Sequence, residues 1–295
     1  MTGYRFSFLL IFLFFLDFLY PISVQGSVKR GLSHEDIYAH VHPSFLKADH
    51  EDLKAELADR VLTPIDWQQK MNSSSWDVLC VGETHSEEYR KNISDFILSG
   101  LKFEHLLLES KASEIKPLLQ GYQKNKSAIL LSASVTQVFQ SAFQNNSELR
   151  ISGIERRSEQ ERLSLNETIL LNRGKLSREA FIAQNIVEVY RPGEKTLALY
   201  GSLHCGKLNK GLGLDTPFFK LMEFYFRSQE MKVSNIRVIR ADEHRVLSAL
   251  LRQYGYLKGE PIVLSNLQEL KPSVYNHQAD LYALFKDYDN LVVIP

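Results

Sequence analysis

The sequence predicts an α/β fold: a single domain with a mainly parallel sheet flanked by helices and one helical insertion. From residue 77 onward, short apolar segments alternate with helix-like segments. Parallel strands need a crossover connection, usually a helix, so this alternation favours βαβ units. Four of the apolar segments also end in a glutamate or histidine. In an open parallel sheet such side chains gather in the crevice outside the carboxyl ends of the strands.

The first strand is expected within residues 77–85, where an apolar run breaks at Gly82. Residues 86–99 should form a helix that ends at Gly100, because apolar residues recur on one helical face. The second strand, within 103–109, should then be the direct parallel neighbour of the first, since a helical crossover commonly joins neighbouring strands.

The remaining elements follow the same alternation. Residues 114–145 read as a mostly helical insertion around Pro117, able to shield the crevice as a lid or wall. Strands are expected at 149–154, 196–200, 235–240 and 290–294, helices near 158–171, 177–190 and 216–227, and a glycine-rich loop at 206–213.

Three segments divide the chain: 1–26 a signal peptide, 27–75 a polar helical lead-in, and 76–295 the α/β domain. Arg5 precedes an apolar stretch, and small residues near 24–26 suit cleavage. An uncleaved anchor is the alternative, but the stretch before Asp17 is short for a span of ~20 residues. We therefore expect a secreted or periplasmic protein with no stable membrane span after cleavage.

The lead-in should contain an amphipathic helix over 48–61, with Leu53, Leu57 and Val61 on one face. It also holds several histidines among acidic residues: His34, His40, His42 and His50. They could form a second metal site, but a solvated surface is the favoured interpretation because no regular element fixes their geometry.

Composition excludes some classes of protein. The 35 Lys and Arg residues balance 35 Asp and Glu residues, so no basic excess points to nucleic acid. Two cysteines, Cys80 and Cys205, are too few for a disulfide-built scaffold. They could pair in an oxidising compartment or stay buried as thiols.

The candidate site residues lie where the predicted strands end: Glu83, His85, Glu109, Glu155 and His204. Chains commonly leave a sheet through polar turns, so any one of these residues could be a turn residue without a functional role. The alternative is weaker for the whole set. Glutamate is not a preferred turn former, and both histidines come shortly after a strand-ending glycine.

Glu83, His85, Glu109 and His204 offer a mixed nitrogen and oxygen set that suits a divalent metal, Zn, Mn or Fe. We expect these four side chains to lie close enough to share one ion or one bound water. A bound metal would lower the pKa of its water and favour hydrolysis. Without metal, the histidines and glutamates could act as general acid/base pairs. The sequence leaves both mechanisms open.

Covalent mechanisms are less favoured. Ser202 lacks the G-x-S-x-G context that a nucleophilic serine needs. Cys205 adjoins His204, but adjacent residues of a strand point to opposite faces, so a Cys/His dyad would need His85 instead.

Several motifs occur in a characteristic order: Gly82-Glu-Thr-His85, Leu106-Leu-Leu-Glu109, Arg178-Glu-Ala-Phe-Ile-Ala-Gln-Asn-Ile186, Tyr200-Gly-Ser-Leu-His204 and the closing strand 287–295. This series resembles the erythromycin esterase, ChaN and TIKI superfamily. Within that superfamily, the chain resembles the ChaN-like members most. The resemblance covers about residues 76–295. It implies site positions at Glu83, His85, Glu109 and His204, a supporting arginine-acidic pair at Arg178 and Glu179, and an approximate match of Arg90 to the esterase's site arginine.

That superfamily includes esterases, metal-dependent proteases and haem-binding uptake proteins. The leading hypothesis is therefore an exported metal-dependent hydrolase acting on an ester or amide of a small molecule or peptide. The alternative is a haem- or metal-binding uptake protein of the ChaN type without turnover. A noncatalytic surface interaction protein is the third class.

Overall fold

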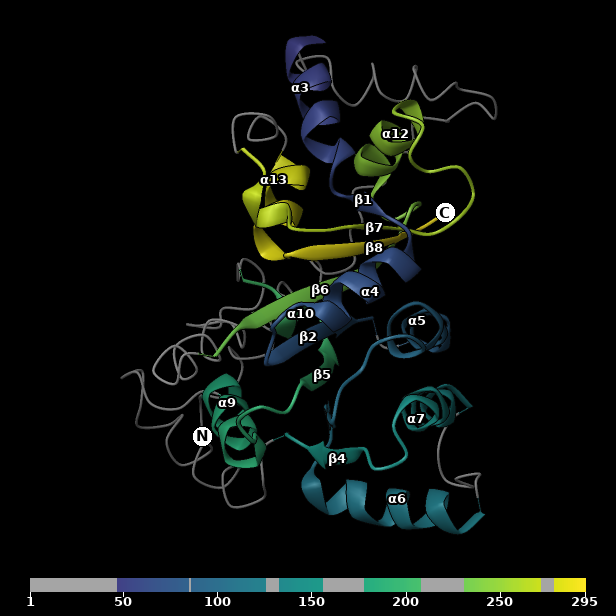
Figure 1. The fold of residues 1–295 in the computed structure, drawn as a ribbon, viewed down its shortest axis with the longest axis vertical. Helices are drawn as coiled ribbons and strands as arrows, with labels where there is room; N and C mark the ends of the chain where they lie inside the picture. The colour runs from purple at the N-terminus through teal and green to yellow at the C-terminus, as the bar shows by residue number, and fades with distance from the viewer. Residues whose placement is uncertain (1–46, 85, 126–132, 156–177, 208–230, 272–278) are drawn as a thin grey trace, which may run out of the picture.

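The structure is a computed structural model that describes residues 47–84, 86–125, 133–155, 178–207, 231–271 and 279–295. Within these residues, eight strands form one sheet in the order β1-β7-β8-β6-β2-β5-β3-β4 (Figure 1). The strands are β1 (Val61–Leu62), β2 (Val78–Glu83), β3 (His105–Leu108), β4 (Arg150–Gly153), β5 (Thr196–Gly201), β6 (Val233–Arg240), β7 (Ile262–Leu264) and β8 (Asn290–Ile294).

The sheet is mainly parallel, which confirms the predicted α/β fold class. All pairs from β8 through β6, β2, β5 and β3 to β4 are parallel. The pairs β1–β7 and β7–β8 are antiparallel. The carboxyl ends of six parallel strands therefore lie along one edge of the sheet, as the site prediction requires.

One expected neighbour relation is wrong. β3 does not pair with β2, because β5 lies between them and pairs with both. β5 is buried along its whole length, whereas β4 at the end of the sheet is only half-buried. A strand that is apolar on both faces needs a central position, and this position directly flanks β2.

The helices confirm most of the predicted pattern. They are α3 (Lys47–Ala58), α4 (Pro64–Ser73), α5 (Glu87–Ile93) with a π-helical turn (Ser94–Leu98), α6 (Ala112–Asn125), α7 (Ala133–Asn145), α9 (Arg178–Val189), α10 (Ser202–Cys205), α12 (Arg245–Gln253), a 3-10 turn (Leu267–Glu269) and α13 (Ala279–Asp287). The helical insertion corresponds to α6 and α7. The helices expected near 158–171 and 216–227 and most of the glycine-rich loop lie outside the described residues.

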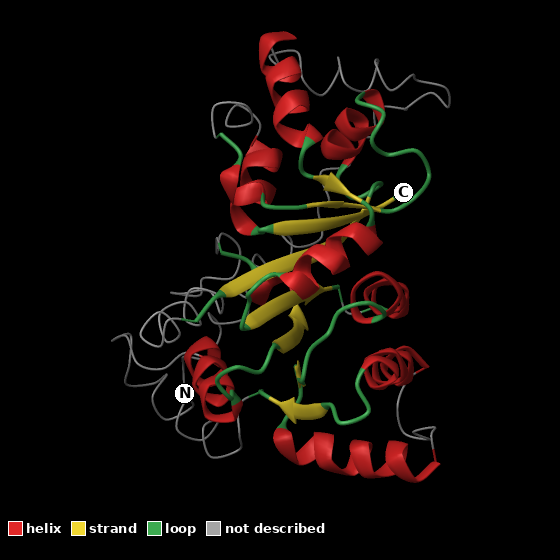
Figure 2. Ribbon diagram, in the orientation of Figure 1, coloured by secondary structure: helices red, strands yellow, loops and turns green. Residues whose placement is uncertain are grey.

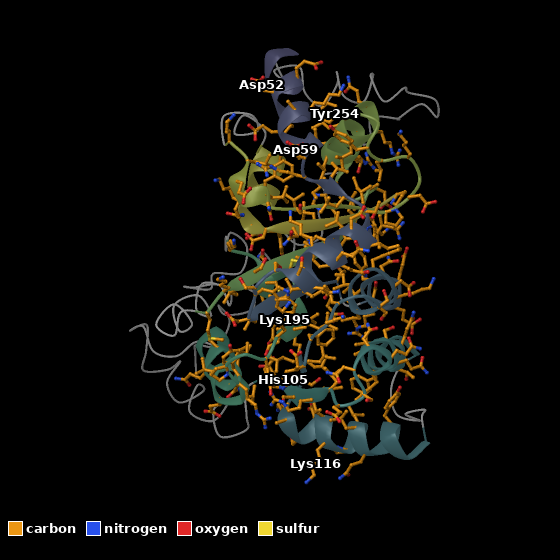
Figure 3. All side chains as sticks on the ribbon, viewed as in Figure 1. Asp52, Asp59, His105, Lys116, Lys195 and Tyr254 are labelled. Atoms are coloured by element: carbon orange, nitrogen blue, oxygen red, sulfur yellow. A yellow bond between two sulfur atoms is a disulfide. The ribbon has the colours of Figure 1, made fainter. Side chains whose placement is uncertain are left out.

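Two apolar cores cover the two faces of the sheet, and side chains fill the space between the sheet and its helices (Figures 2 and 3). Along β2, Val78 and Cys80 join one core, and Leu79 and Val81 join the other. We call the first the α9 face, because it also packs α3, α9, α12 and α13. The second is the α5 face, which packs α4, α5, α6 and α7.

The end of the lead-in belongs to this packing. Leu53 and Leu57 of α3 are fully buried in the core of the α9 face, and β1 extends the sheet. Thr63 caps α4 by accepting a hydrogen bond from the Asp66 backbone N–H at 3.1 Å, which satisfies a free donor of the first turn. Three of the four lead-in histidines and the predicted signal lie outside the described residues.

None of the helices in the described ranges is both long and apolar enough to cross a membrane.

Candidate functional site

The strand ends place four of the predicted site residues at the carboxyl edge of the sheet. Glu83 is the last residue of β2, Glu109 directly follows β3, and Glu155 lies just beyond β4. His204 lies on α10, which begins as β5 ends. His85 lies outside the described residues, and Arg178 begins α9 with its side chain outside them as well.

Glu83 is only 5% exposed, and its charge is matched by Arg90 of α5. Arg90 Nε donates to Glu83 Oε2 at 3.2 Å, and Nη2 donates to Oε1 at 3.3 Å. Two parallel bonds from a guanidinium fork to a carboxylate fix both groups in one orientation. Ser86 caps α5, and the start of the helix at this cap places Arg90 on the turn that lies next to the end of β2.

Glu109 lies beside this pair and holds the end of β5. Its Oε2 accepts a hydrogen bond from the Gly201 backbone N–H at 2.8 Å. Glu83, Arg90 and Glu109 line one cavity of about 90 Å³, with Leu108, Ser110, Val138 and Leu199 as the rest of its described wall. Glu83 and Glu109, two of the four side chains predicted to share one ion or water, therefore line the same cavity.

Glu155 and His204 are connected through a tyrosine. The Tyr200 hydroxyl donates to Glu155 Oε2 at 3.0 Å, and the His204 ring packs edge-on against the Tyr200 ring at 4.9 Å between centroids. Asn185 of α9 donates to the backbone carbonyl oxygens of Ile154 and Glu155. α9 thereby fixes the end of β4, next to this second group.

The two groups meet at the end of β5. Glu109 binds the backbone of Gly201, and the preceding residue, Tyr200, binds Glu155. The described contacts thus place the predicted glutamates and His204 around one strand end, in a carboxylate–guanidinium group and a carboxylate–phenol–imidazole group.

Several contacts hold α10 against the sheet. Cys205 forms a disulfide with Cys80 of β2, which answers the question that the sequence left open. Both cysteines are fully buried. The Tyr288 hydroxyl donates to the Ser202 carbonyl oxygen, and Asn235 donates to the Cys205 carbonyl oxygen. These bonds give the backbone around His204 a fixed position.

The predicted metal site includes His85, which lies outside the described residues. Among the described residues, no group of three or more His, Cys, Asp and Glu side chains is arranged to hold a metal ion. Both oxygens of Glu83 accept bonds from Arg90, and a cation would have to compete with that guanidinium. We therefore derive no reaction step through a metal.

Tyr200 was not among the predicted site residues, and Arg90 was named only as an approximate match to the esterase's site arginine. Arg90 follows Glu83 by seven residues, just past the cap of the next helix. This placement was the available signal, since the first turn of a crossover helix packs near the strand end that it leaves. Tyr200 is a fully buried tyrosine before the strand-ending glycine, and a buried hydroxyl needs a partner.

No protein-family model matches the chain, and no curated protein matches it in sequence. Solved structures do match. A protein from Bacillus cereus aligns at a TM-score of 0.51 and 12% identity, over 84% of this chain and 97% of its own. A succinoglycan biosynthesis protein aligns at 0.51 and 10% identity, with the same coverage of both chains.

The fold is shared with these proteins. ChaN of Campylobacter jejuni also matches, at a TM-score of 0.40 and 13% identity, over 80% of this chain and 96% of its own. The two structures matched at a TM-score of 0.51, at 12% and 10% identity, show that this chain shares their fold, and they show the fold alone. Folds host unrelated activities, so the function has to be argued from the site.

Proposed function

We propose that the protein is an exported hydrolase that cleaves an ester or amide bond of a small molecule or peptide. The observation that carries the proposal is the cavity at the carboxyl edge of the sheet, where Glu83, Arg90 and Glu109 converge. In open parallel sheets this edge is where ligands bind. The guanidinium of Arg90, held in place by Glu83 in a small cavity, is a fixed positive charge of the kind that stabilises a developing oxyanion.

Each group has a role in this reaction. Glu83 holds Arg90 in place, and the guanidinium is oriented to polarise the carbonyl of the scissile bond. Glu109 fixes the turn into α10 and so the position of His204. His204 and His85 would be the general acid and base, a role that contributes typically ~10²–10⁴-fold to a rate. Glu155 and Arg178 would support them.

Export is part of the proposal, and two features support it. The N-terminal segment has the charge and apolar pattern of a secretory signal. The buried pair Cys80–Cys205 is a disulfide, a bond that persists in oxidising compartments and is rare in the cytosol.

The test is turnover of chromogenic esters and amides by the purified protein. We expect activity that falls at least ~100-fold in Arg90→Gln and in His204→Ala, because each change removes a charge or proton-transfer group. The matched control is Lys102→Gln, a charge-neutralising change near the amino end of β3. Turnover that is equal in wild type and Arg90→Gln would refute the proposal.

Treatment with a chelator tests whether activity requires the predicted Zn, Mn or Fe ion. If the acid/base mechanism holds, turnover should be the same before and after dialysis against EDTA. Activity that is lost on dialysis and restored by one of these ions would instead show a metal-dependent hydrolase, with the Glu83–Arg90 pair rearranged around the ion.

Haem binding without turnover is the second candidate, and the motif series favours it because the superfamily includes haem-binding uptake proteins. ChaN of Campylobacter jejuni binds heme cofacially. The cavity of about 90 Å³ is smaller than the ~300–1,000 Å³ typical of ligand pockets, so haem, like the bulk of a hydrolase substrate, would lie over its mouth at the carboxyl edge. Titration with haemin decides: a Soret band that is lost in His204→Ala, together with no turnover, would favour this candidate over the hydrolase.

A further inference from the structure

Arg237 is a second arginine at the carboxyl half of the sheet. It lies on β6, the neighbour of β2 in the sheet (Figure 1), and pairs in register with Gly82, one residue before Glu83. Its neighbours Ile236 and Val238 face the core of the α5 face, so Arg237 points to the α9 face. That is the face on which α10 covers Gly82: a Cβ added to Gly82 would lie 3.0 Å from the Ser202 Cα.

The Arg237 guanidinium is held against an aromatic ring. Its central carbon lies 5.7 Å from the centroid of the Tyr288 ring. Tyr288 is buried, and its hydroxyl donates to the Ser202 carbonyl oxygen. A cation over an aromatic face is attracted by the ring's negative charge density. Tyr288 thereby orients Arg237 beside the turn from β5 into α10.

The charge of Arg237 acts on tyrosines that pack on both faces of the sheet. Burial and the nearby carboxylate of Glu243 raise the pKa of the Tyr89 phenol on α5, and the positive charge of Arg237 opposes that rise. Arg237 also acts on Tyr288, whose pKa burial raises. The guanidinium is therefore within electrostatic reach of phenols that pack on opposite faces, as expected for a group near the edge of the sheet.

The charge of Arg237 has no carboxylate partner in the described part of the chain. Arg90 pairs with Glu83, and Arg240 pairs with Glu88 and Asp242, but none of the described ion pairs includes Arg237. Its Nε is buried and donates no hydrogen bond. A buried donor without an acceptor costs about 1–3 kcal/mol, so it calls for an explanation.

We propose that Arg237 binds an anionic group, a carboxylate or a phosphate, of a ligand at the carboxyl edge of the sheet. A guanidinium presents its N–H donors in a planar fork that matches the oxygens of either group. The ring of Tyr288 already fixes the orientation of that fork, so little conformational freedom is lost when an anion binds. Combined with the proposed function, on which this step rests, the substrate class becomes an ester or amide that carries an acidic group.

The test measures the binding of inorganic phosphate and of acetate to the full protein by calorimetry, at constant ionic strength. We expect wild type to bind at least one of them saturably and Arg237→Gln to bind it at least tenfold more weakly. Arg252→Gln, a change at an exposed arginine of α12, should bind as wild type does. Binding of phosphate but not acetate would identify the ligand's anionic group as a phosphate, and binding of acetate but not phosphate would identify it as a carboxylate.

Two results would overturn the inference: wild type that binds neither anion, and Arg237→Gln that binds within twofold of wild type. Arg237→Gln should fold, because it leaves no carboxylate without its partner and removes the unsatisfied Nε donor. Should it fail to fold, Arg237→Lys keeps the charge without the fork, and we expect it to bind the anion several-fold more weakly. Unchanged affinity in that variant would also count against the inference.

Anion binding needs no turnover, so this inference and the proposed function fail separately. Loss of phosphate or acetate binding in Arg237→Gln, in a protein without hydrolytic activity, would support the anion site and refute the hydrolase. Hydrolysis by a protein that binds neither anion would do the reverse.

Discussion

At the scale of single residues, the buried charged groups of the site are explained by their partners. A carboxylate as buried as that of Glu83 is unfavourable unless it is paired, and Arg90 supplies both the charge and two hydrogen bonds. His105 shows the opposite solution. It lies on β3, where Figure 3 labels it. It is fully buried, and its Nε2 shares a hydrogen bond of 2.8 Å with the Ser152 hydroxyl.

His105 should make stability depend on pH. Burial, and next the charge of Arg150, lower its pKa to about 4, whereas an unfolded histidine titrates near ~6.5. Between these values the unfolded chain binds the extra proton. The free energy of unfolding should therefore be unaffected by this group above pH ~6.5 and fall by up to ~3 kcal/mol as pH drops towards 4. Denaturation of wild type and His105→Gln across this range isolates the effect, and identical pH slopes would contradict it.

Gly82 should be sensitive to the smallest substitution. A Cβ there would lie 3.0 Å from the Ser202 Cα, which is backbone and cannot rotate away. Gly82→Ala should cost about 1–3 kcal/mol of unfolding free energy, as overpacking does. Gly121→Ala in α6 is the matched control: nothing lies within 4 Å of its added methyl, and it should stabilise the helix by ~0.5–1 kcal/mol. Equal effects of the two changes would argue against close packing of α10 on β2.

At the scale of elements, strong hydrophobic patterns predicted structure well. The ends of β2, β3 and β4 close to Glu83, Glu109 and Glu155 follow from apolar runs and their breaks, and so does the helix α9. The antiparallel pair β1 and β7 was not predicted, because strands of two and three residues carry too little pattern. The place of β5 between β2 and β3 depends on tertiary packing, which no local spacing in the sequence encodes.

The disulfide is the covalent link between two elements, β2 and α10, that are far apart in the chain. Cys80 and Cys205 are separated by 125 residues. Replacing both with alanine should lower the unfolding free energy by about 2–5 kcal/mol, because the unfolded chain gains freedom and the core loses contacts. Urea denaturation of oxidised wild type and of the double variant measures this difference. A change below ~0.5 kcal/mol would mean that the other bonds of α10 suffice.

At the scale of the whole molecule, the sheet carries an apolar core on each face, and the end of the lead-in contributes to both. Leu57 of α3 belongs to the core of the α9 face, and Trp67 of α4 to that of the α5 face. The Trp67 ring N–H also donates to Asn290 Oδ1 of β8 at 3.3 Å. We therefore regard residues 47–75 as a structural part of the α/β unit.

Leu57→Ala tests that role. Truncating a fully buried leucine should cost about 2–5 kcal/mol, whereas Ile65→Ala at a 65% exposed position of α4 should change stability by less than ~0.5 kcal/mol. Thermal or urea denaturation reports both. We expect a single unfolding transition, which Leu57→Ala shifts as a whole. Loss of a separate minor transition would instead mark residues 47–75 as an independent unit.

The most direct measurement of the central claim is a double-mutant cycle on the Glu83–Arg90 pair, read out as kcat/KM on the best ester or amide substrate. If the two side chains act as one unit, Glu83→Gln and Arg90→Gln should each lower kcat/KM at least ~100-fold, and the double variant should be little worse than either single variant. Glu148→Gln, an exposed glutamate before β4, should leave kcat/KM unchanged. Independent, additive losses would contradict a functional pair, and single variants as active as wild type would contradict the catalytic site itself.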